Sequence, residues 1–176
     1  GALHALQHFG QAGLQFLNAR RCAHSLLCAL PRRARAGELI DLWLSHLVLC
    51  AVRPAGVDPV SRYFSEDLIL HLQPVEDPLS LLAPWAEAWQ AGQRAPLPFF
   101  ARTSLAWARA WTREPEAPAA ALAAALKEWA PSFSGNGKVP QRDEPAIALA
   151  FRHADPLADP AFAELARSLL VPLAER

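Results

Sequence analysis

The sequence contains no methionine, only three cysteines and no apolar run long enough for a membrane. Cys22, Cys28 and Cys50 are odd in number and lack the CxxC or Cys/His spacing of a metal site, so we expect reduced thiols in a cytoplasmic protein. The apolar stretch 39–52 contains an aspartate and a histidine, and it is too short to span a bilayer. Because methionine is missing even at position 1, we predict that the chain is a piece of a longer protein.

An excess of either charge is also missing, since 17 basic residues balance 17 acidic ones. No global field therefore attracts nucleic acid or a membrane. The distribution is uneven, however, because residues 1–53 carry a net charge of +4 and the remainder carries −4. Arg32, Arg33 and Arg35 place three guanidinium groups within four residues, which suits phosphate contacts. A solvated connector or a partner-docking patch is the more common role of such a cluster, so these roles stay open.

Motifs of known catalytic sites are absent. The sequence has no G-x-S-x-G, Walker or G-x-G-x-x-G motif. Its six histidines are far apart and lack carboxylates at metal-ligand spacing. The acidic pairs at 66–67, 76–77 and 143–144 stand at predicted turns or helix starts, where capping and solvation explain them. The residues alone therefore predict a protein without its own active site, and we expect no metal and no cofactor.

The hydrophobic pattern predicts a mixture of helices and strands. Two β-hairpins are expected, over 3–19 and 59–73, while the short apolar stretch 23–30 fits a helix or a strand. The expected helices cover 37–52, 78–92 with Asp77 as N-cap, a segment capped by Thr103, 119–130, 145–151 and 159–170. A chain of 176 residues with 52% hydrophobic content is expected to form a single domain over 1–176. Its predicted class is α+β, or the helical back of a mixed sheet.

A segment rich in proline and aromatic residues, 95–104, separates two helices that carry tryptophan. Its prolines remove backbone donors and hold the chain extended, so we expect Leu97, Phe99 and Phe100 to be buried. The six tryptophans could offer stacking surfaces for bases. Most of them follow a helical spacing among apolar neighbours, and we therefore predict that they pack in the core.

Four segments together resemble a known family. They are LWLSHL at 42–47, the stretch 85–100 ending in PLPFF, ALAFR at 148–152, and 162–172. In this order and spacing they resemble the C-terminal domain of the exodeoxyribonuclease V gamma subunit, RecC, from about residue 37 onward. The resemblance implies membership of RecBCD, a bacterial helicase–nuclease that processes double-strand DNA ends for recombinational repair. The gamma subunit of that complex separates the DNA strands, scans for the Chi sequence and holds the beta (RecB) and alpha (RecD) subunits.

The resemblance also implies a degenerate PD-(D/E)XK nuclease-like fold, in which a small antiparallel or mixed sheet packs with several helices. An active nuclease of this fold gathers an Asp and an Asp-x-Lys triplet around Mg²⁺. In this chain His4, Asn18 and Arg20 occupy the corresponding positions. Neutral and cationic side chains do not hold a divalent ion as carboxylates do, so a lost metal site is expected.

The sequence thus favours a non-catalytic scaffold and DNA-handling domain. Its expected contacts with DNA phosphates or with a partner are arginines of the basic N-terminal third: Arg20, Arg21, Arg32, Arg33 and Arg35. Two alternatives stay open. The first is an active nuclease whose metal site lies in a part of the protein outside this chain. The second is a generic protein-interaction domain without a link to DNA.

Overall fold

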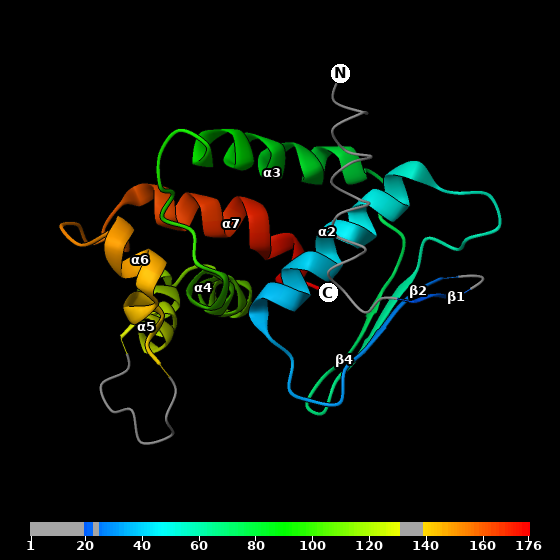
Figure 1. Ribbon diagram of the computed structural model, residues 1–176, viewed down its shortest axis with the longest axis horizontal. Coiled ribbons are helices and arrows are strands. Elements are labelled where there is room, and N and C mark those ends of the chain that lie inside the picture. Colours follow the sequence, from blue (N-terminus) through cyan, green and yellow to red (C-terminus); the bar gives the residue numbers. More distant parts are fainter. Residues whose placement is uncertain (1–19, 23–24, 131–138) are drawn as a thin grey trace. The chain divides into compact units, whose positions relative to one another are not determined.

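A computed structural model describes residues 20–22, 25–130 and 139–176 of the chain (Figure 1). These residues fall into two compact units, of which the first extends to Ala83 and includes Arg176, and the second extends from Pro84 to Glu175. The described residues contain six α-helices, one short 3-10 helix and four strands. The predicted α+β class is therefore confirmed, whereas a single domain over 1–176 stays a prediction. The hairpin expected over 3–19, together with His4 and Asn18, lies outside the described residues.

The first unit contains the sheet, whose strands follow the order β1-β2-β3-β4. The strands are β1 (Arg20–Cys22), β2 (Ser25–Ala29), β3 (Ser61–Phe64) and β4 (Ile69–Leu72). Strand β2 pairs in parallel with β3, whereas the other two pairings are antiparallel, so the sheet is mixed. The pairing of β3 with β4 confirms the hairpin predicted over 59–73, and the open segment 23–30 proves to contain a strand.

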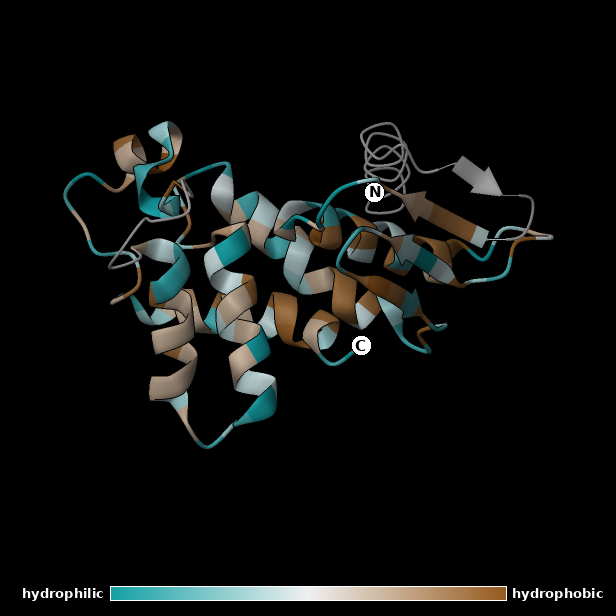
Figure 2. Ribbon diagram, turned by 90° about the horizontal axis from the view of Figure 1, so that it is seen from below, coloured by the Kyte–Doolittle hydropathy of each residue, from teal (hydrophilic) through white to brown (hydrophobic). Residues whose placement is uncertain are grey.

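Helix α2 (Ala36–Val52) connects the parallel strands β2 and β3 and covers one face of the sheet (Figure 1). Parallel neighbours need such a crossover connection, because the chain must return from the end of the first strand to the opposite end of the sheet, where the second strand starts. The helix contributes Trp43 and Leu47, and the sheet contributes Cys28, Tyr63 and Leu72, all of them fully buried. The strands and α2 are largely hydrophobic (Figure 2). The helix predicted over 37–52 is thus confirmed, along with the core packing predicted for Trp43.

The second unit is helical. Its core helices are α4 (Ala101–Arg113), α5 (Pro118–Trp129) and α7 (Pro160–Ala174), and α4 packs against both of the others. Ala108, Ala121, Ala125 and Ala166 are completely buried. Such small side chains let helix backbones approach one another closely, which explains why an alanine-dense segment forms part of a core. The remaining elements are η1 (Gln141–Asp143), α6 (Pro145–Ala150) and α3 (Pro78–Gly92). The division of the chain into two units falls within α3, between Ala83 and Pro84.

The burial predicted for the segment rich in proline and aromatic residues is confirmed for Phe100, whereas Leu97 and Phe99 are only half-buried. Pro98 and Phe100 are buried, and the ring of Phe100 lies 4.6 Å from that of Trp129 and 5.3 Å from that of Phe151. These are normal separations for interacting aromatic rings. The segment therefore ties the start of α4 to two distant elements of the same unit.

Three local predictions need correction. Helix α4 begins at Ala101 with Phe100 as its N-cap, so Thr103 lies inside the helix, where its hydroxyl donates to Gln141. Trp89 is 56% exposed and does not belong to the packed stripe of α3, because burial in that helix fades toward its C-terminal end. Helix α7 continues past residue 170 to Ala174 despite Pro172. The buried Leu173 explains this extension, since its packing offsets the one backbone hydrogen bond that proline removes.

Candidate functional site

Residues 31–35, here called the arginine connector, join β2 to α2. The connector is held against the turn between β3 and β4 by two hydrogen bonds to its backbone. The Glu66 N–H donates to the Arg32 carbonyl at 3.1 Å, and the Ala34 N–H donates to Asp67 Oδ1 at 2.8 Å. The Ser65 hydroxyl also donates to Asp67 Oδ1, at 3.1 Å. These bonds fix the backbone conformation of the connector, which the sequence alone does not predict. They therefore also fix the positions from which the arginine side chains extend.

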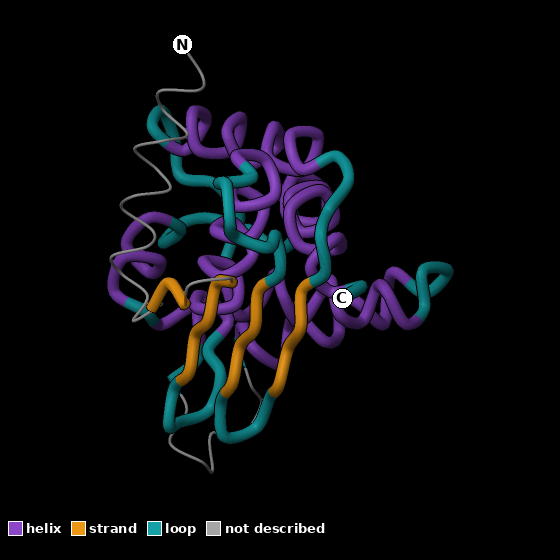
Figure 3. Tube along the Cα trace, turned by 90° about the vertical axis from the view of Figure 1, so that its right-hand side faces the viewer, coloured by secondary structure: helices purple, strands orange, loops and turns teal. Residues whose placement is uncertain are grey.

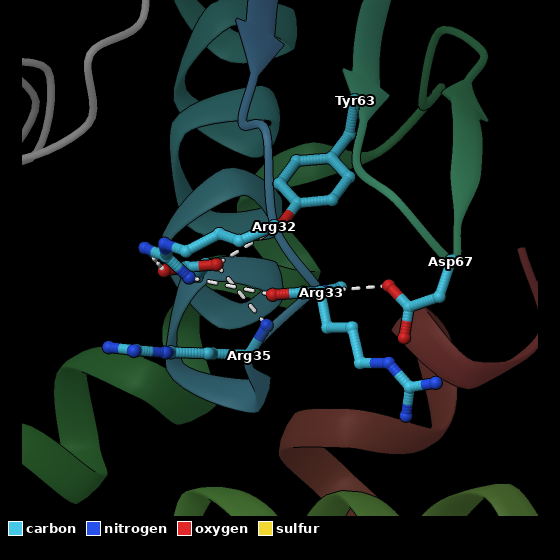
Figure 4. Close-up of polar contacts among 7 residues, drawn as sticks. Arg32, Arg33, Arg35, Tyr63 and Asp67 are labelled. Atoms are coloured by element: carbon cyan, nitrogen blue, oxygen red, sulfur yellow. Dashed lines mark hydrogen bonds and ion pairs between the residues drawn. The ribbon is translucent and has the colours of Figure 1, made fainter.

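Glu38, in the first turn of α2, collects donors from both sides of the connector (Figure 4). Its carboxylate forms an ion pair with Arg32 and accepts hydrogen bonds from the Tyr63 hydroxyl at 3.1 Å and the Arg35 N–H at 3.2 Å. A carboxylate at this position accepts a hydrogen bond from a free backbone N–H, and its negative charge interacts favourably with the positive end of the helix dipole. Burial raises the pKa of Glu38, but the donors from Arg32, Arg35 and Tyr63 outweigh burial and hold the pKa below its ordinary value.

The three connector arginines do not converge on one point. Arg32 is held by Glu38, whereas Arg33 and Arg35 are exposed, and within the described residues their guanidinium groups make no ion pair or hydrogen bond. Figure 4 shows Arg35 extending to the same side as Arg32, while Arg33 extends to the opposite side, toward Asp67. The Ala34 N–H and the Ser65 hydroxyl lower the pKa of Asp67, and the Arg33 charge lowers it further. The site therefore offers two outward-directed cations, Arg33 and Arg35, and a third, Arg32, that is paired with Glu38.

Arg20 and Arg21 lie elsewhere, in the edge strand β1. Their backbones are paired with those of Leu27 and Leu26. The structure thus brings together three of the five arginines singled out by the sequence and leaves these two on a separate part of the same sheet. His4 and Asn18 lie outside the described residues.

Sequence reasoning missed the residues that organise the connector, which are Glu38, Tyr63 and Asp67. Glu38 had a local signal, because it follows the helix-starting Arg35 by three positions, as in a capping box. Tyr63 and Asp67 had none. The β3–β4 hairpin brings them to the connector from about 30 residues away, and no local pattern reports such a pairing.

A second polar cluster lies in the core of the first unit. The Nδ1 atom of His46 is 2.8 Å from Ser61 Oγ, and its Nε2 atom is 2.9 Å from the Gln73 carbonyl. Because a carbonyl only accepts, Nε2 carries the proton and Nδ1 accepts from the serine. The thiol of Cys50 completes the cluster, but His46 and Ser61 are 0% exposed. No substrate reaches a site of this kind, so we interpret these nucleophile-type residues as structural.

Within residues 20–22, 25–130 and 139–176 no three His, Cys, Asp or Glu side chains gather into a possible metal site. The free thiols of Cys28 and Cys50 are buried. Burial raises the pKa of the Cys28 thiol, and the Glu38 carboxylate raises it further. A thiol in that state is a poor nucleophile and a poor metal ligand. None of the helices in these ranges is long and apolar enough to cross a membrane.

The fold and this site define a class: an α+β domain that holds a fixed arginine loop beside a small mixed sheet. Comparison with family models identifies the family within that class. The model of the RecC C-terminal domain matches residues 2–112, and the chain belongs to this family, which makes it a part of the RecBCD complex. The match includes the sheet and the connector, but it ends before the segments 148–152 and 162–172 that also carried the resemblance. A comparison with curated proteins found no match.

Proposed function

We propose that this chain is a non-catalytic scaffold and DNA-handling domain of the gamma subunit in a RecBCD-type exodeoxyribonuclease V. It would act in the cytoplasm, with the beta and alpha subunits as partners, in the repair of double-strand breaks by homologous recombination. Strand separation and Chi recognition would belong to the whole subunit. The proposal includes a degenerate PD-(D/E)XK-like fold. The observation that carries it is the fixed arginine connector, which holds Arg33 and Arg35 outward.

The connector suits an anionic partner for two physical reasons. Its backbone is already ordered by Glu66 and Asp67, so binding costs less conformational entropy than it would on a free loop. A guanidinium group also binds phosphate or carboxylate oxygens through paired donors. Arg32 differs from Arg33 and Arg35, because its charge is already used by Glu38. We therefore assign binding to Arg33 and Arg35, and a positioning role to Arg32.

The test is a double charge reversal, Arg33→Glu with Arg35→Glu, in the gamma polypeptide assembled with the beta and alpha subunits. We expect the affinity for DNA ends, or for one of the two subunits, to fall by about tenfold or more. The matched control is Arg94→Glu with Arg152→Glu, which changes the charge equally at exposed positions of the second unit. If the connector variant kept both its DNA affinity and its assembly with the other subunits, the proposal would be wrong.

The non-catalytic part of the proposal has its own test. It rests on His4, Asn18 and Arg20 in place of the carboxylates and lysine that a working nuclease needs. The purified gamma polypeptide, without its partner subunits, should leave linear DNA intact in the presence of Mg²⁺. Cleavage that a chelator abolishes would favour the active-nuclease alternative.

A further inference from the structure

The arginine connector and the acidic turn between β3 and β4 lie side by side. Because β2 and β3 run parallel, the chain leaves both strands at the same end of the sheet, where Figure 3 shows the two teal loops below the orange strands. Asp67 in this turn is exposed, and its Oδ1 atom accepts the Ala34 N–H at 2.8 Å and the Ser65 hydroxyl at 3.1 Å. Arg33 extends toward the same residue (Figure 4). One carboxylate thus bonds to the connector and also lies on the side of one of its two outward arginines.

This placement gives Asp67 two effects of opposite sign on the binding of an anion. Its hydrogen bond to the Ala34 N–H fixes the connector backbone, which lowers the entropy cost of binding. The same bond lowers the pKa of Asp67, so the carboxylate is ionised at neutral pH. Its negative charge attracts the Arg33 guanidinium and repels a phosphate or carboxylate that approaches it. A side chain that only held the loop would not need this charge, since the amide oxygen of asparagine also accepts a backbone N–H in turns.

Glu38, at the other side of the connector, shows a different arrangement. Its carboxylate forms an ion pair with Arg32, so both charges are used internally. Within the described residues Arg33 forms no ion pair, and its donors stay available to an external anion. Asp67 therefore acts on Arg33 as a nearby charge, which reduces the attraction for the anion and leaves the donors free.

We propose that Asp67 is a positioning residue that also limits the affinity of the connector for its anion. Its Oδ1 atom holds the loop from which the arginines extend, and its charge weakens the binding of a phosphate or carboxylate oxygen at Arg33. This inference rests on the proposed function, because it concerns the same anion. It adds a residue whose neutralisation strengthens binding, whereas every change to the arginines weakens it.

Asp67→Asn separates the two effects, because it removes the charge and keeps an oxygen that accepts the Ala34 N–H. The experiment measures binding of labelled DNA ends, and assembly with the beta and alpha subunits, at low salt, where charges are least screened. In the measurement that the charge reversal of Arg33 and Arg35 weakens, we expect Asp67→Asn to bind about two- to fivefold more tightly than the native protein. A role confined to the structure of the loop predicts unchanged or weaker binding, and that result would overturn the inference.

Two further variants check the separate parts of the inference. Asp67→Ala removes the acceptor as well as the charge, so it should bind less tightly than Asp67→Asn, and equal binding would overturn the positioning role. Glu66→Gln is the matched control, because it removes the same charge from an exposed neighbour in the same turn that contacts the connector through its backbone N–H. A gain as large as that of Asp67→Asn would show a general effect of net charge and would also overturn the inference.

A double-mutant cycle links the effect to Arg33. The gain from Asp67→Asn should vanish when Arg33→Gln is present, because no anion then binds on the side of the carboxylate. An equal gain with and without Arg33 would show that Asp67 acts elsewhere and would contradict the inference. If the charge reversal of Arg33 and Arg35 changed neither measurement, the proposed function itself would be wrong. The failure of one proposal is therefore distinguishable from the failure of the other.

Discussion

At Glu38 a single carboxylate receives donors from the connector, from the start of α2 and from β3. Tyr63 is the most interior of these donors, being 0% exposed. We expect Tyr63→Phe to lower the free energy of unfolding by about 1.5–3 kcal/mol, because the change removes a hydrogen bond to a charged group while keeping the ring. Urea unfolding of both proteins measures the difference. An unchanged midpoint would contradict the role given to Glu38 as the organiser of the connector.

His46 makes the stability of the first unit depend on pH. Burial lowers its pKa, the hydrogen bond to the Gln73 carbonyl raises it in part, and Arg176 lowers it further. The folded chain thus binds a proton at this ring less readily than the unfolded chain, whose histidine pKa is about 6.5. The stability that depends on neutral His46 is present above about pH 6.5 and is lost as the pH falls below it, at no more than about 1.4 kcal/mol per pH unit.

The measurement is the slope of unfolding free energy against pH, compared between the native chain and His46→Gln. We expect the variant to lose the part of the slope that lies below about pH 6.5. His71→Gln is the matched control, because it removes an exposed histidine of the same unit in place of the buried one. Equal slopes in the native chain and His46→Gln would show that the buried ring does not control this dependence.

At the scale of elements, periodicity and capping residues predicted most of what the structure describes. The spacing of apolar residues predicted helix α2. Asp77 predicted the start of α3, and its Oδ1 accepts the Ser80 N–H at 3.2 Å. Both signals are local. The errors arose where tertiary contacts determine the local structure. Thr103 has the sequence features of a helix cap, but its N–H and hydroxyl donate to the distant Gln141. The partners of the connector escaped prediction for the same reason.

Gln141 in η1 caps α4 from a distance. Its Oε1 accepts from both the N–H and the hydroxyl of Thr103, each at 2.9 Å, and both residues are buried. Gln141→Ala leaves two buried donors without their acceptor, so we expect a loss of about 1–3 kcal/mol in unfolding free energy. Thermal unfolding measures it, with Gln93→Ala, an exposed position, as the control. A loss no larger than that of the control would contradict this account of the start of α4.

For the whole molecule, the single domain predicted over 1–176 has a consequence that these variants test. If the chain unfolds in one cooperative step, Tyr63→Phe in the first unit and Gln141→Ala in the second should shift the same transition. We expect one calorimetric peak that moves with either change. Two peaks, each sensitive to only one of the variants, would instead make the two compact units separate domains.

The balanced charge of the molecule also shapes how it would bind DNA. With 17 basic and 17 acidic residues there is no global field, so any phosphate contact depends on local arginines. Each phosphate contact contributes about 0.7–0.9 to the slope of log affinity against log salt concentration. We expect Arg33→Gln with Arg35→Gln to reduce the magnitude of that slope by about 1.4–1.8 in the assembled complex, twice the contribution of one contact. Binding of labelled DNA ends across a salt series measures it, and a slope equal to that of the native complex would mean that these two side chains face something other than phosphate.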